Sequence, residues 1–295
     1  MTPLDYDFLR YALKQRSGLA LAADKHYFLE SRLLPLARQA GFAGVGELVL
    51  ALKSGRDTAL MDAVVEAMTT NESFFFRDKT PFDHFRRIVM PALLAARRQS
   101  RSIRIWCAAA ASGQEPYSIA LCLKEMERAT AGWRIEILAT DLSGAVLDRA
   151  RRGLYSQFEV QRGLPIKLLV KYFTQVGEQW QIAPKIRTMV KYHRFNLLSD
   201  FASLGSFDLI LCRNVLIYFD QNTKSDVLRR LAGTVASDGY LILGAAETAL
   251  GLSDRFKMII DKPGLYAINA TVPPPVPQQR TTQARPRLVA IGGGR

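Results

Sequence analysis

The strongest constraint on the fold is an alternation of strand-length apolar runs with helical segments through the C-terminal part of the chain. The runs are RIWCAAA at 104–110, RIEILATDLS at 134–143, FDLILCRNVLIYF at 207–219, GYLILGAAE at 239–247 and GLYAINA at 264–270. Helical patterns lie between them at 118–129, 144–155 and 221–236. Strands that alternate with helices form a parallel, doubly wound sheet, so the sequence predicts an α/β, Rossmann-like domain.

The rest of the chain has other patterns. In residues 1–70 the apolar positions recur at three and four, which predicts a small all-helical N-terminal domain. We expect a linker and ligand-contacting loop at 71–90 and the α/β domain at 91–270. An insertion at about 165–195 predicts a short helix and three strands, 173–177, 179–183 and 188–195, paired as an antiparallel flap. The five prolines of 271–295 predict a disordered tail.

Composition excludes several classes of protein. No apolar run reaches the roughly 20 residues of a spanning helix, and MTPLDYDFLRYALKQ has no apolar signal region, so we expect a cytoplasmic protein without direct membrane insertion. Cys107, Cys122 and Cys212 lie far apart in apolar stretches, which predicts reduced, buried thiols. The three histidines lack metal-ligand spacing, and no metal is expected. A net charge of +13 suits an acidic partner without identifying it.

Polar residues stand where three of the predicted strands end: Glu115, with Gly113 before it in the same turn, then Asp141, and then Arg213 and Asn214. An open parallel sheet binds its ligand at the carboxyl ends of its central strands. Asp141 is therefore placed to accept both hydroxyls of a ribose, although the sequence DLSGAVLD also permits it to cap a helix that starts near Ser143.

The turn after the first strand, AAASGQE at 109–115, argues against a dinucleotide. It has a single glycine, Gly113, so the backbone cannot approach a pyrophosphate closely, and Glu115 would repel phosphates. The ligand should have a ribose and no phosphate. S-adenosylmethionine meets this description, because it combines an adenosine with a cationic sulfonium and an ammonium group that a carboxylate can bind.

A second informative stretch is MTTNESFFFRD at 68–78. Asn71, Ser73 and Arg77 surround three phenylalanines, a composition that suits an ordered loop closing over a ligand. Arg77 has the planar guanidinium that binds a carboxylate with two hydrogen bonds. The alternative is a helix cap followed by a buried aromatic cluster.

Six blocks together resemble the chemotaxis receptor methyltransferase family, CheR. They are MTTNESFFFRD, IWCAAAASGQEPYSIA, ATDLS, FNLL, FDLILCRNVLIYFD and LRRLAGTVASDGYLILGAAE, and the likeness extends from Met1 to about Asn269. The resemblance implies a class I S-adenosylmethionine-dependent methyltransferase domain. It also implies methyl transfer to glutamates on the cytoplasmic helices of chemoreceptors, with S-adenosylhomocysteine as the second product.

The same resemblance implies roles for individual residues. The cofactor contacts are Asn71, Ser73, Arg77, Glu115, Asp141, Asn196, Leu197, Arg213 and Asn214. Arg77 and Tyr218 are similar to the pair that the family places beside the transferred methyl. Two departures concern Ser73, where the family often has threonine, and ASGQE in place of STGEE, so that Gln114 replaces an acid while Glu115 remains.

The partner is the least constrained part of the prediction. The stretch TQVGEQW has one glycine, Gly177, and resembles family members that work without a receptor C-terminal pentapeptide. We expect a monomer that acts on chemoreceptor helices and does not act on nucleic acid, because a nucleic-acid methyltransferase would need an N/D-P-P-Y/F motif or an activated cysteine. A non-catalytic cofactor-binding or scaffold protein with this fold remains the alternative, and turnover separates the two.

Overall fold

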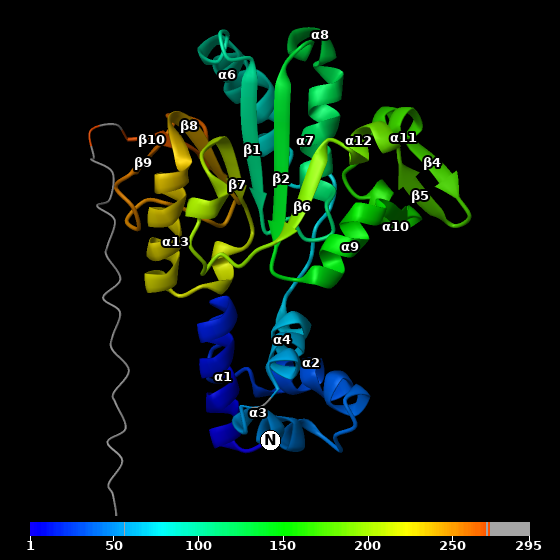
Figure 1. Ribbon diagram of the computed structural model, residues 1–295, viewed down its shortest axis with the longest axis vertical. Helices are drawn as coiled ribbons and strands as arrows, with labels where there is room; N and C mark the ends of the chain where they lie inside the picture. Colours follow the sequence, from blue (N-terminus) through cyan, green and yellow to red (C-terminus); the bar gives the residue numbers. More distant parts are fainter. Residues whose placement is uncertain (56, 270, 272–295) are drawn as a thin grey trace, which may run out of the picture.

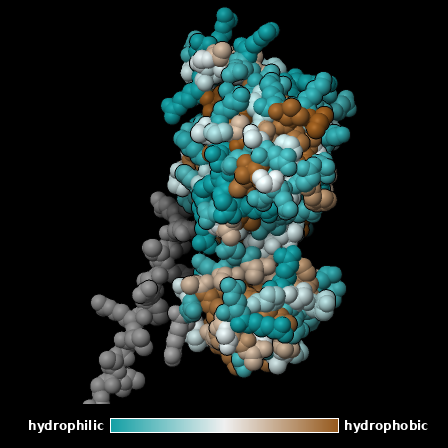
Figure 2. Space-filling view, turned by 90° about the vertical axis from the view of Figure 1, so that its right-hand side faces the viewer, coloured by the Kyte–Doolittle hydropathy of each residue, from teal (hydrophilic) through white to brown (hydrophobic). Residues whose placement is uncertain are grey.

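The N-terminal part of the chain is a bundle of four helices. The computed structural model describes residues 1–55, 57–269 and 271. The helices are α1 (Pro3–Ser17), α2 (His26–Gln39), α3 (Val45–Lys53) and α4 (Thr58–Met68). Their apolar faces close on a core of their own, with Leu9, Leu33 and Val64 fully buried. The bundle forms a separate lobe, joined to the rest of the molecule at a waist (Figures 1 and 2), and the predicted all-helical N-terminal domain is confirmed.

The second lobe is built on a sheet of seven strands in the order β6-β2-β1-β7-β8-β10-β9. The strands are β1 (Ser102–Ala108), β2 (Arg134–Asp141), β6 (Val190–Arg194), β7 (Phe207–Cys212), β8 (Val235–Leu243), β9 (Phe256–Met258) and β10 (Leu265–Ile268). Strands β6, β2, β1, β7 and β8 are parallel, as the alternation predicts. The two at one edge, β10 and β9, are antiparallel, so the sheet is mixed and the expectation of a wholly parallel sheet is wrong there.

Helices cover both faces of this sheet and form two apolar cores. One core includes α5 (Thr80–His84), the π-helical turn η1 (Phe85–Val89), α6 (Met90–Ala96) and α7 (Gln114–Glu125), and the short α8 (Glu127–Thr130) follows α7. It also includes α9 (Gly144–Arg152). The other core lies under α13 (Gln221–Thr234) and contains Trp106, whose indole is fully buried. In Figure 1 the carboxyl ends of the parallel strands point toward the N-terminal lobe.

The insertion differs from its prediction in one strand. Strands β4 (Phe173–Val176) and β5 (Gln179–Ile182) pair antiparallel as expected, but their third partner is β3 (Leu154–Ser156). The segment 188–195 instead supplies β6, which joins the main sheet parallel to β2. The helices of this region are α10 (Gln157–Gln161), α11 (Ile166–Tyr172) and α12 (Pro184–Arg187).

The boundaries of two other elements also differ from those predicted. The helix expected at 118–129 begins at Gln114, which brings Glu115 into its first turn. The run at 207–219 ends as a strand at Cys212 and continues into the 3-10 turn η3 (Leu216–Tyr218), and a second such turn, η2, spans Ala202–Leu204. The three cysteines are free and buried, as predicted. The proposed disordered tail at 271–295 lies outside the described residues except for residue 271, and no described helix has the length and apolar content to cross a membrane.

Candidate functional site

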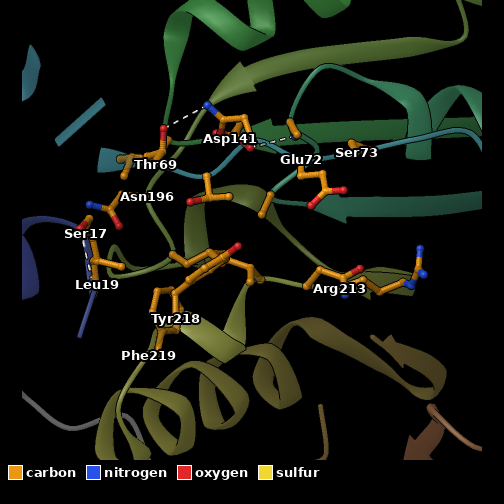
Figure 3. A pocket seen from close by; sticks show the side chains of 18 of the residues that line it. Ser17, Leu19, Thr69, Glu72, Ser73, Asp141, Asn196, Arg213, Tyr218 and Phe219 are labelled. Atoms are coloured by element: carbon orange, nitrogen blue, oxygen red, sulfur yellow. Dashed lines mark hydrogen bonds between the residues drawn. The ribbon is translucent and has the colours of Figure 1, made fainter. Parts of the chain in front are cut away.

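A pocket opens where the strand ends face the N-terminal lobe. It encloses about 1030 Å³ of empty space, part of which is open to solvent. Its lining includes all ten residues singled out from the sequence: Asn71, Ser73, Arg77, Glu115, Asp141, Asn196, Leu197, Arg213, Asn214 and Tyr218. Figure 3 shows Asp141 on one side of the pocket and Arg213 and Tyr218 on the other. The fold thus brings every candidate together, while the role of each stays a prediction.

The pocket lies at the point where the chain reverses its direction of travel across the sheet. From β1 the chain moves outward to β2 and β6, and it then returns to β7 on the other side of β1. Such switch points leave a crevice between the loops that follow the two central strands. The position therefore follows from topology, with the loops after β1 and β7 as opposite walls.

Asp141 joins two of the loops that line this crevice. Its Oδ2 accepts the backbone N–H of Ala111 at 2.9 Å, and its Oδ1 accepts that of Ser143 at 2.9 Å. Burial raises the pKa of the carboxyl, although these hydrogen bonds act in the opposite direction. A carboxylate has about four acceptor positions, so these bonds do not exhaust its capacity to accept a ligand hydroxyl. The helix cap is Ser143, whose Oγ accepts from Val146, so Asp141 does not cap α9 itself.

Backbone strain is concentrated around the pocket. Eight non-glycine residues of the described chain have positive φ, and six of them lie in the three loops at its rim: Phe76, Asp78, Lys79, Ala109, Ala111 and Asn214. Such conformations cost of order 1–3 kcal/mol each and persist where the surroundings impose them. The alanine-rich turn lacks the usual glycines, so its positive φ angles are maintained by the packing around it.

Arg213 is the centre of a buried ionic network. Its side chain is 1% exposed, and it donates to Glu115 at 2.5 Å and to Asp78 at 2.8 Å. A third bond goes to the carbonyl oxygen of Arg77 at 2.8 Å. Burial raises the pKa of Glu115, and the adjacent guanidinium opposes that rise. Removal of either partner of such a buried pair leaves an unpaired charge, which is strongly destabilising.

One donor in this network is unused. Within the described part of the chain, Nε of Arg213 is buried and has no hydrogen-bond partner. Glu115 lines the pocket together with Arg213, so the wall here carries a carboxylate beside a buried guanidinium. Such a carboxylate is complementary to the ammonium group of an amino acid.

The loop between the lobes carries Arg77 and is tied down along its length. Arg32 of α2 donates to the carbonyl oxygen of Thr69 at 2.9 Å, and the N–H of Phe76 donates to Ser118 at 3.0 Å. The half-buried Arg77 donates to the carbonyl oxygen of Glu72 at 2.9 Å. The loop is thus ordered, as its composition predicts, with the aromatic residues packed behind it.

The N-terminal lobe forms a wall of the pocket that sequence reasoning missed. Ser17 and Leu19 line it, and the N–H of Ala20 donates to the carbonyl oxygen of Tyr218 at 2.9 Å. Asn196 donates through its side chain to the carbonyl oxygen of Arg16 at 2.6 Å. No motif marks this segment, because its contribution comes mainly from backbone groups.

Glu247 is another residue of the site region that the sequence analysis did not single out. Its carboxylate is buried and accepts four backbone N–H groups, those of Asn214, Val215, Ile217 and Gly244, at 2.8, 2.9, 3.3 and 2.8 Å. It therefore fixes the loop after β7 that carries Asn214 and Tyr218. The signal available in the sequence was an acid at the end of the apolar run at 239–247.

The chemistry open to this pocket is that of buried carboxylates and arginines. Among the described residues no group of three or more His, Cys, Asp or Glu side chains is arranged to hold a metal ion. The polar groups instead suit an organic ligand with hydroxyls at one end and an amino-acid group at the other. Arg77 and Tyr218, which also line the pocket, are then available to a second substrate.

Comparisons with known proteins agree with this picture. The family description "CheR methyltransferase, all-alpha domain" matches residues 4–69, and "CheR methyltransferase, SAM binding domain" matches 71–264. "Chemotaxis protein methyltransferase 1" of Pseudomonas aeruginosa is 42% identical over 88% of this chain and 96% of that protein. "Chemotaxis protein methyltransferase Cher2" of Pseudomonas putida is 41% identical over 89% and 96%. A Vibrio cholerae protein called "Chemotaxis protein methyltransferase 1" is 37% identical over 88% and 94%.

Proposed function

We propose, because the chain belongs to the CheR methyltransferase family, that it methylates glutamate side chains on the cytoplasmic helices of chemoreceptors. The products would be a glutamate methyl ester and S-adenosylhomocysteine. The chain is an S-adenosylmethionine-dependent methyltransferase of the chemotaxis type. The part that we propose beyond this family membership is that the acceptor of the methyl group is a carboxylate.

Three features of the pocket support the fit of S-adenosylmethionine. Asp141 retains lone pairs for the two ribose hydroxyls. Glu115 has the negative charge that an ammonium group requires, and the guanidinium of Arg213 lies beside it in the pocket lining. The turn at 109–113 lacks the glycines that a pyrophosphate would need.

The observation that most supports a carboxylate acceptor is the position of Arg77 and Tyr218. Both line the same pocket as Asp141 and Glu115, so a cation and a phenol are available beside the ligand site. The cofactor, when bound, supplies a methyl group that an oxygen nucleophile can attack. An acceptor glutamate has an ordinary pKa of about 4.3 and is ionised at neutral pH, so no strong general base is required.

The contribution of the protein is then alignment and exclusion of water. Arg77 would bind the acceptor carboxylate and hold one of its oxygens in line with the methyl group, while Tyr218 would shape the pocket or donate a hydrogen bond. In-line displacement with neutralisation of opposite charges gains from near-contact distance and from a dry site. The C–O bond forms as the C–S bond breaks, and the bonding pair stays on sulfur.

The ligand assignment is tested by calorimetry with S-adenosylhomocysteine. We expect binding by the wild-type protein and a loss of at least about tenfold in affinity for Asp141→Ala, since two hydroxyls lose their acceptor. Asp148→Ala is the matched control, because Asp148 is 66% exposed on α9 and pairs with the exposed Arg151 one turn away. Equal affinities for the wild-type and Asp141→Ala proteins would contradict the assignment of Asp141 as the ribose contact.

The acceptor assignment is tested by methyl transfer to a chemoreceptor cytoplasmic fragment, with DNA and RNA as competing acceptors. Arg77→Ala should lower kcat by about a hundredfold, as expected when a substrate is misaligned. Tyr218→Phe separates two roles, since a small loss of rate leaves only the shaping role. Binding without any turnover would instead favour a scaffold protein with this fold.

Independence from a receptor C-terminal pentapeptide is part of the same proposal. In the insertion the turn between β4 and β5 contains only Gly177 and Glu178, which leaves little room for a glycine-rich binding loop. We expect no measurable binding of an Asn-Trp-Glu-Thr-Phe peptide. Micromolar affinity by calorimetry would overturn this part and leave the methyl transfer untouched.

A further inference from the structure

In the structure the insertion extends back to β3, and Arg162, within it, reaches the loop that carries Arg77. It follows α10 and donates to the carboxylate of Glu72 at 2.7 Å. Its guanidinium carbon lies 4.2 Å from the ring centroid of Phe74, and that of Arg77 lies 5.4 Å from the same centroid. One phenylalanine ring therefore has two guanidinium groups near it, one from the insertion and one from the pocket.

The insertion is fixed against this loop by close backbone packing. Gly163, next to Arg162, has φ +87°, and a Cβ there would lie 2.1 Å from the carbonyl oxygen of Phe75. The ring of Phe75 makes edge contacts with Tyr155 and Phe173, with centroids 5.0 and 5.6 Å apart. The position of Arg162 relative to the loop is consequently set by packing as well as by its ion pair.

Glu72 lies between the two arginines. Its carboxylate is bonded to Arg162, while its carbonyl oxygen accepts from Arg77. The hydrogen bond from Arg162 is the main cause that lowers the pKa of Glu72, and the charge of Arg77 adds to it. Glu72 also lines the pocket, so without Arg162 an unpaired carboxylate would stand beside Arg77 at the place where the acceptor must approach.

We infer that Arg162 is a positioning residue, which neutralises Glu72 and so keeps the guanidinium of Arg77 available for the acceptor carboxylate. The inference rests on the proposed function, since it requires an anionic acceptor. It makes the insertion a contributor to methyl transfer through one side chain. Without Arg162, Glu72 pairs with Arg77 and repels the substrate.

Double substitution distinguishes this role from simple ordering of the loop. Arg162→Ala should lower kcat for methyl transfer to the receptor fragment by about tenfold. Adding Glu72→Gln to that variant should recover kcat to within about threefold of wild type, because the competing charge is gone. Arg162→Lys keeps an ion pair with Glu72 and should retain most of the activity. Arg229→Ala is the control, since Arg229 forms a comparably exposed pair with Asp226.

A binding measurement provides a readout without turnover. With S-adenosylhomocysteine present, the affinity of the receptor fragment should fall about tenfold in Arg162→Ala and return in the double variant with Glu72→Gln. If both variants are equally impaired, Arg162 only orders the loop, and the inference is overturned. The same holds if Arg162→Ala matches wild type. No transfer by the wild-type protein contradicts the proposed function itself, whereas the other two outcomes leave that function standing.

Discussion

Substitution of Glu247 is the sharpest test of how the site is held in shape. Oε2 accepts the N–H groups of Asn214 and Gly244, and Oε1 accepts those of Val215 and Ile217. Glu247→Gln keeps the size of the side chain and one oxygen. Its NH₂ group then faces two backbone N–H donors that have lost their acceptor.

The magnitude follows from these two donors. A hydrogen bond to a charged group contributes about 1.5–3 kcal/mol, and the donor of Gly244 is buried, so we expect a loss of about 3 kcal/mol in the free energy of unfolding. For a chain of this size that corresponds to a fall in Tm of about 6 to 12 °C. Affinity for S-adenosylhomocysteine should fall with it, because the same loop carries Asn214.

Thermal unfolding and calorimetry on the same preparations provide the assay. Glu127→Gln serves as the control, because Glu127 is 70% exposed and its ion pair with Lys124 lies at the surface, so the Tm of this variant should change by less than about 1 °C. A Glu247→Gln protein that stays within about 2 °C of wild type and keeps its affinity would refute the idea that this carboxylate holds the loop.

Three further predictions concern the turn after β1, the buried charge network and the contact between the lobes. Gly113→Ala should weaken S-adenosylhomocysteine binding by about tenfold, because Gly113 has φ +91° and the added Cβ would lie 2.7 Å from the hydroxyl of Tyr192. Gly177→Ala is the control for the effect of positive φ alone, because its Cβ would meet no atom within 4 Å. Burial raises the pKa of Glu115, and a bound ammonium favours the ionised form, so affinity for S-adenosylmethionine should rise with pH through that raised pKa and level off above it; calorimetry at several pH values that shows no rise contradicts the contact. The hydrogen bond from Lys14 lowers the pKa of Asp220 to about 2 from 3.8, so the pair stabilises the fold above about pH 4 and loses this effect as the pH falls toward 2. Lys14→Met should therefore cost at most about 1 kcal/mol at pH 7, given the exposure of the pair, and this cost should shrink in urea unfolding as the pH falls through the lowered pKa; a difference as large at pH 2 as at pH 7 would exclude the ion pair as its source.

The sequence was sufficient for the site because topology places strand ends together. Asp141 and Arg213 are 72 residues apart, yet Asp141 ends β2 and Arg213 follows β7, and the carboxyl ends of such parallel strands share one edge. The alternation of apolar runs predicted these strands without any long-range information. The loop at 68–78 was predicted to be ordered from its aromatic residues, and it packs as expected.

The insertion was mispredicted because local periodicity does not identify a strand's partner. In β6, Val190 and Tyr192 are buried while Lys191 and His193 are exposed, a pattern that suits an edge strand of the main sheet as well as an antiparallel flap. The short β3 was hidden in a helical pattern that continues past Gly153, where φ of +63° ends α9. Pairing partners and boundaries of this kind depend on tertiary contacts.

Glu247 and the wall from the N-terminal lobe were missed for a related reason. The partners of Glu247 include N–H groups 30 to 33 residues away, and backbone donors leave no signature in side-chain composition. The contact between Ala20 and Tyr218 likewise joins two backbone groups across the waist between the lobes. Positions that act by accepting or donating to backbone become visible only when the chain is folded.

The central claim is that the acceptor is a carboxylate, and the most direct measurement is the chemical stability of the transferred methyl group. The protein would be incubated with labelled S-adenosylmethionine and a chemoreceptor cytoplasmic fragment, and the labelled fragment would then be treated with mild alkali. A glutamate methyl ester hydrolyses to volatile labelled methanol, and label should be absent from a fragment whose acceptor glutamates are replaced by alanine. Label that resists alkali, or that persists in the substituted fragment, would contradict methyl transfer to glutamate.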